Sequence, residues 1–170
     1  MSKMAHRLNR SPNLACPFFM PVRKSEDGVW QHPSRLPLGC GWTGFCCAPG
    51  HERVQPTDEE LRSFCNLGYA TNCPRLPQER TCDAVRFGIA RDTGSQILLL
   101  FVCEAGHLPT AHGTLEYDLS SGRWILSHAD PQIQKMAECY LESYLLRRIP
   151  SPRGGSCPKE THDSSTYEAK

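Results

Sequence analysis

The sequence predicts an α+β fold in which an irregular N-terminal module, rich in cysteine and proline, packs on a four-stranded antiparallel meander with one C-terminal helix. Prolines and glycines break residues 13–82 into short loops. Apolar and polar side chains then alternate with period two from about Asp83, which is the pattern of half-buried strands. A stripe of apolar residues at helical spacing follows the strands.

The 170-residue chain, of which 39% is hydrophobic, has the material for one modest core. We therefore expect a single domain over residues 13–149, made of a cysteine-rich metal-binding module (13–82) and an antiparallel sheet with a helix (83–149). Residues 1–12 are polar and basic, and residues 150–170 are rich in proline, glycine, serine and charge. We expect both ends to be disordered.

The irregular half contains one clear helix signal. Thr57 and Glu60 form a capping box, so a short helix is expected to follow Thr57, with Cys65 in its last turn and Gly68 as its C-terminal cap. The rest of this half has little regular structure and few apolar residues. We expect its folding free energy to come largely from metal ligation.

The second half is expected to contain four strands joined by short connections, and hence antiparallel. Ile97–Cys103 is the most apolar strand and is expected to be central. In chain order the elements are a strand at 85–89, a turn at 92–94, the strand at 97–103, a longer loop at 106–113, a strand at 115–119, a turn at 120–122 and a strand at 124–126.

Asp130 and Pro131 predict the start of a helix, as N-cap and first helical residue. Arg147 and Arg148 favour its C-terminal end. Its apolar stripe, which should lie across one face of the sheet, consists of Ile133, Met136, Ala137, Tyr140, Leu141, Tyr144 and Leu145.

Charge and hydropathy exclude some classes of function. The net charge is +1 and the basic residues are scattered, so we expect no nucleic-acid partner. No stretch approaches the ~20 apolar residues that span a bilayer, and Met1–Lys24 lacks the apolar segment of a signal peptide. We expect a cytoplasmic protein without membrane association, acting through a protein partner whose identity the sequence does not indicate.

The ten cysteines are the main functional signal. Without an export signal their thiols should stay reduced, and a cysteine-dense segment then favours metal ligation over disulfides. Four have surroundings typical of ligands, with neighbouring glycines, prolines or aromatic residues. The predicted ligand set is Cys16, Cys46, Cys65 and Cys73, with Cys47, Cys40 and Cys82 in reserve.

The remaining cysteines and the histidines of the second half are not expected to bind a metal or to act in catalysis. Cys103, Cys139 and Cys157 are expected to be buried or idle thiols. His107, His112 and His128 could gather at a sheet edge, but no carboxylate is obviously paired with them, which favours solvated loop histidines.

The spacing of the cysteines bears on the metal. Structural zinc sites usually contain close cysteine pairs, and this chain has none: five residues separate Cys40 from Cys46 and seven separate Cys65 from Cys73. Wide spacing and the Cys-Pro sequence at Cys16 and Cys73 favour a four-cysteine iron–sulfur cluster. Its role would be electron transfer, redox sensing or structural support. The alternatives are a zinc-stapled interaction module and, third, a thiol enzyme with one nucleophilic cysteine.

Overall fold

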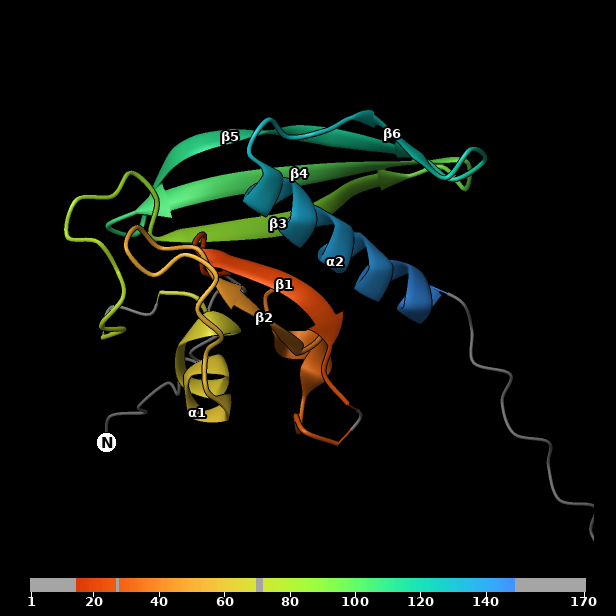
Figure 1. Ribbon diagram of the computed structural model, residues 1–170. Helices are drawn as coiled ribbons and strands as arrows, with labels where there is room; N and C mark the ends of the chain where they lie inside the picture. The colour runs from red at the N-terminus through yellow and green to blue at the C-terminus, as the bar shows by residue number, and fades with distance from the viewer. Residues whose placement is uncertain (1–14, 27, 70–71, 149–170) are drawn as a thin grey trace, which may run out of the picture.

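The structure, a computed structural model, describes residues 15–26, 28–69 and 72–148. The described chain forms two antiparallel sheets, of two and four strands, and a C-terminal helix (Figure 1). The predicted α+β class and the four-stranded meander are confirmed. The ends at 1–12 and 150–170, for which disorder is predicted, lie outside the described residues together with Cys157.

The large sheet contains β3 (Ala84–Asp92), β4 (Gln96–Ala105), β5 (Leu108–Asp118) and β6 (Arg123–Leu126), adjacent in that order. Each pairs antiparallel with the next. Val85 and Phe87 of β3, with Ile97 and Leu99 of β4, are buried. The alternation seen in the sequence therefore corresponds to one covered face of this sheet.

The longer loop expected at 106–113 is wrong. The β4–β5 connection is a tight turn of Gly106 and His107, and β5 begins at Leu108. Both turn residues have positive φ, +57° and +65°, as in the turns that suit the twist of a two-residue hairpin. Pro109 is accommodated because it lies next to a register shift at Cys103 and Glu104.

The N-terminal half contains a second, small sheet that was not expected. Its strands are β1 (Phe19–Lys24) and β2 (Trp42–Cys46), and the short 3-10 helix η1 (Pro33–Arg35) lies in the connection between them. Gly44 is required by close packing, because a Cβ there would lie 2.0 Å from the carbonyl oxygen of Met20. Ala15 also exchanges two backbone hydrogen bonds with Val85, which ties this half to β3.

The capping box is confirmed. Thr57 accepts a hydrogen bond from the Glu60 N–H, and the Glu60 carboxylate accepts one from the Thr57 N–H. The helix α1 (Asp58–Glu60) continues directly into the π-helical turn η2 (Leu61–Cys65), which places Cys65 at its last position. Gly68 follows with φ of +65°.

The helix α2 (Pro131–Arg148) starts where the sequence predicts, with Asp130 accepting hydrogen bonds from the N–H groups of Gln132 and Ile133. Figure 1 shows α2 crossing the large sheet, and it contacts both β1 and β3. None of the helices in the described residues is long and apolar enough to cross a membrane.

One apolar core joins the two halves of the chain. Phe19, Trp42 and Leu61 from the first half pack in the same buried cluster as residues of the sheet and of α2, including Met136. The first half therefore buries apolar side chains of its own. The expectation that metal ligation supplies most of its folding free energy is not supported by this packing.

Candidate metal centre

Four separate segments each bring one cysteine to a single cavity. Cys16 precedes β1, Cys46 ends β2, Cys65 ends η2 and Cys73 lies in the loop that follows. All four line one small cavity of about 20 Å³. They are the four that the sequence analysis selects as a ligand set.

The surroundings of this cavity, which we call the four-cysteine cavity, are mostly apolar. Phe18, Phe19, Phe64, Ala48 and Leu76 complete most of its lining. Glu60 and Arg75 also line it and form an ion pair of 2.7 Å. These two opposite charges leave the lining without net charge, and the aromatic rings cover part of the cavity.

Burial raises the pKa of two of these thiols, Cys16 and Cys65. It raises the pKa of Cys16 to about 12, although backbone N–H groups of Phe18 and Phe19 partly oppose the rise by stabilising the thiolate. The pKa of Cys65 is also raised, first by burial and then by the nearby Cys16, Cys46 and Cys73. Four thiols this close cannot all ionise without a cation, so binding a metal must release protons.

Asn66 connects the segments that carry Cys46 and Cys65. Its side chain is 4% exposed. The amide oxygen accepts from the Trp42 N–H at 2.9 Å, and the amide nitrogen donates to the carbonyl oxygens of Trp42 and Leu61, each at 3.0 Å. The first residue of β2 is thus fixed to the turn that ends in Cys65.

Sequence reasoning missed this role of Asn66. The only signal was its position next to a candidate ligand, since nothing in the sequence pairs it with Trp42, 24 residues away.

The donors fit a metal centre by their chemistry, but the cavity is narrow. Thiolates are the preferred ligands of zinc and of iron–sulfur clusters. Within the described residues, no group of three or more His, Cys, Asp or Glu side chains is arranged to hold a metal ion. A cavity of about 20 Å³ has room for roughly one water molecule. Any metal centre would therefore have to widen the site, and Cys16 and Cys73 are the two candidate ligands that lie outside helices and strands.

The reserve cysteines lie elsewhere. Cys47 does not line the four-cysteine cavity; it follows β2, and its N–H donates to the carbonyl oxygen of Phe18. Cys40 lines a different cavity, beside Trp30 and Gly41. Cys82 lines an open cleft together with Cys103. Cys139 is buried on α2.

The histidines have separate surroundings. His107 stacks on Tyr69 with ring centroids 4.3 Å apart, and His128 meets the edge of Phe101 at 4.6 Å. His112 lies on β5 opposite Val102. These contacts are those of packed surface side chains, in agreement with the ordinary interpretation.

Comparison with known proteins adds no relative: no protein family, no curated protein and no solved structure matches the chain.

Proposed function

We propose that the chain binds a [4Fe–4S] cluster through Cys16, Cys46, Cys65 and Cys73. The observation that carries the proposal is the convergence of these four cysteines, from four segments, on one cavity. The other described cysteines, at 40, 47, 82, 103 and 139, do not line it.

Two features favour a cluster over a single ion. In a cluster each thiolate binds a different iron atom, which suits four cysteines delivered by four separate segments. The backbone N–H groups of Phe18 and Phe19 also stabilise the Cys16 thiolate, which lowers its pKa against the effect of burial. Such N–H donors to sulfur are among the interactions that set the reduction potential of a cluster.

The residues of the chain have distinct roles in this proposal. The four thiolates bind, the backbone N–H groups stabilise Cys16, and the phenylalanine rings exclude water. A bound cluster supplies one-electron chemistry or a structural link. Electron transfer, redox sensing and structural support are all compatible with a site under apolar cover.

Zinc is the second candidate, and the size of the cavity favours it. A site of about 20 Å³ has to widen less for one ion than for an iron–sulfur cube. The chain would then be a zinc-stapled interaction module without redox activity.

Metal and sulfide analysis of anaerobically purified protein tests the proposal. We expect a brown protein with about four iron and about four sulfide per chain. Cys16→Ser, Cys46→Ser, Cys65→Ser and Cys73→Ser should each lose most of the iron, because a serine hydroxyl is a poor ligand. Cys47→Ser is the matched control for Cys46→Ser, and Cys40→Ser and Cys82→Ser are controls for the other reserve cysteines.

The outcomes separate the candidates. Colourless protein with about one zinc per chain, lost on Cys65→Ser, would replace the cluster with the zinc alternative. Iron loss from Cys47→Ser but not from Cys46→Ser would show that the wrong neighbour is assigned. Protein that stays free of metal after anaerobic reconstitution with iron, sulfide or zinc would overturn both.

A further inference from the structure

Cys82 and Cys103 form a pair of thiols that the four-cysteine cavity does not use. Cys82 lies just before β3 and Cys103 lies in β4, where its partner in the ladder is Val85. Both side chains line one cleft and lie close enough for each to shift the pKa of the other. The Cys82 thiol also lies 3.3 Å from the carbonyl oxygen of Ala84.

The pair lies in the wall of an open cleft of about 890 Å³. Cys82 is half-buried, whereas Cys103 is 7% exposed. Polar side chains of Arg80, Thr110 and Gln132 also line the cleft. Its volume lies in the range of small-molecule sites, roughly 300–1,000 Å³.

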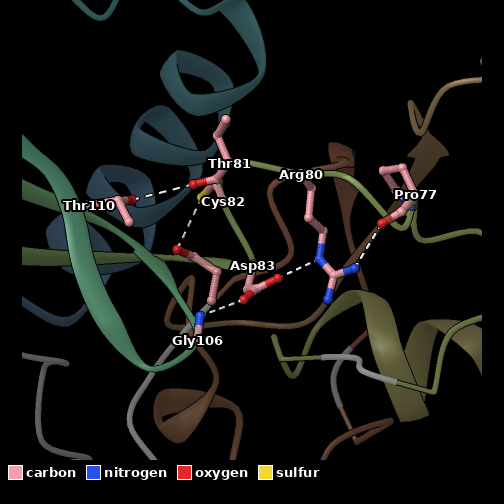
Figure 2. Close-up of polar contacts among 8 residues, drawn as sticks. Pro77, Arg80, Thr81, Cys82, Asp83, Gly106 and Thr110 are labelled. Carbon is pink, nitrogen blue, oxygen red and sulfur yellow. Dashed lines mark hydrogen bonds and ion pairs between the residues drawn. The ribbon is translucent and has the colours of Figure 1, made fainter.

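The backbone around Cys82 is anchored on each side (Figure 2). Arg80 pairs with Asp83 and donates to the carbonyl oxygen of Pro77 at 2.8 Å. Asp83 accepts from the Gly106 N–H at 2.7 Å, and the Thr110 hydroxyl lies 3.3 Å from the Cys103 carbonyl oxygen. The backbone that carries the two cysteines is thus fixed where they face the same cleft, which limits the chain movement that a bond between them would need.

We propose that Cys82 and Cys103 are a redox-active dithiol that reduces a low-molecular-weight disulfide bound in this cleft. The Cys103 thiolate attacks one sulfur atom of the disulfide; a bond from Cys103 to that sulfur forms, the bond of the small disulfide breaks, and one thiol leaves with a proton. Cys82 then gives up its proton and attacks the Cys103 sulfur, which forms the Cys82–Cys103 disulfide and releases the second thiol. The protein loses two electrons, and the small disulfide gains them.

The electrostatics agree with these roles. The neighbouring Cys82 side chain lowers the pKa of Cys103 to about 7, and the same interaction raises the pKa of Cys82. Cys103 is therefore the thiolate of the pair near neutral pH, and Cys82 is the thiol that resolves the mixed disulfide.

This inference does not depend on the metal proposal, and peptide mapping tests it directly. The full chain is incubated anaerobically with excess oxidised glutathione, free thiols are blocked with N-ethylmaleimide, and the protein is digested with trypsin. Residues 81–86 and 92–123 are separate tryptic peptides, and each contains a single cysteine, Cys82 or Cys103. We expect these two peptides joined by a disulfide, with about two reduced glutathione molecules released per chain.

Two variants assign the order of attack. Cys82→Ser should stop after the first step and keep glutathione on the 92–123 peptide, while Cys139→Ser, on the buried face of α2, should give the joined peptides as the parent does. The inference is overturned if the parent's two peptides remain alkylated, or if glutathione labels Cys47 as readily as this pair. The parent protein alone decides this, so a variant that fails to fold does not leave the question open.

Discussion

Replacing Asn66 by alanine should lower the free energy of unfolding by more than is usual for a residue outside the apolar core. The side chain is almost fully buried and satisfies both the N–H and the C=O of Trp42. Leu61 keeps a backbone partner, because its carbonyl oxygen also accepts from the Asn66 N–H at 3.2 Å. The loss therefore falls mainly on Trp42. A buried polar group left without a partner costs about 1–3 kcal/mol, so two such groups should cost about 3 kcal/mol in all.

Urea denaturation measures this loss, and Asn72→Ala is the matched control because Asn72 is exposed. The midpoint should fall for Asn66→Ala without a change of slope, since the surface exposed on unfolding is nearly the same. Metal content should fall too, because Asn66 links the segments of Cys46 and Cys65. If Asn66→Ala and Asn72→Ala lose equal stability, within about 0.5 kcal/mol, then Asn66 does not hold these segments together.

Three further predictions concern the cap, the buried thiols and the thiol pair. Thr57→Ala removes the acceptor of the Glu60 N–H and should cost about 1 kcal/mol in urea denaturation, whereas Thr57→Ser should stay near the parent. In metal-free protein, burial raises the pKa of Cys16 from 9.0 to about 12, so the folded state favours the neutral thiol. Its contribution to stability is complete below pH 9 and is lost as the pH rises toward 12; Cys16→Ala should flatten this fall, and an unchanged curve would contradict it. The rate of Cys103 alkylation by iodoacetamide, followed on the 92–123 peptide, should rise through about pH 7 and level off above it. Cys82→Ala, which removes the donor, should move that rise by more than one pH unit toward the ordinary range of about 8.5, and a curve that stays in place would show that Cys82 does not set it.

Local sequence signals predicted the elements whose causes are local. The capping box needs only Thr57 and Glu60, three residues apart, and the start of α2 needs only Asp130 and Pro131. The strands of the large sheet follow from alternation, because one of their faces meets α2. These signals require no knowledge of distant parts of the chain.

The β1–β2 sheet was missed because its signals are weak or non-local. Pro21 lies inside β1, beside a register shift, and a proline in a short run argues against a strand. In the sequence, Gly44 suggests a loop. In the structure, glycine is required at this position because the backbone of Met20 lies so close to it. The pairing also joins segments about 20 residues apart, which composition does not indicate.

The candidate sites likewise include residues that the sequence predicted and residues that it did not. Residue type and neighbouring aromatics were enough to select Cys16, Cys46, Cys65 and Cys73, which the fold brings to one cavity. The pair of Cys82 and Cys103 was not foreseen, because a strand cysteine ordinarily serves as a small apolar side chain. Only the antiparallel pairing of β3 with β4 brings it beside Cys82.

The shared core also predicts that folding precedes the metal binding that we propose. The four-cysteine cavity exists only once β1, β2 and η2 are packed, and their packing rests on Phe19, Trp42 and Leu61 in the core. A site built this way follows folding, unlike the small zinc domains in which binding free energy is folding free energy. Removing the metal should therefore loosen the loop that carries Cys73 and leave the two sheets in place. Amide hydrogen exchange, compared before and after the metal is removed, tests this order. Faster exchange around residues 72–83, with β3 and β4 still protected, would agree with it. Loss of protection throughout the chain would mean that ligation drives folding.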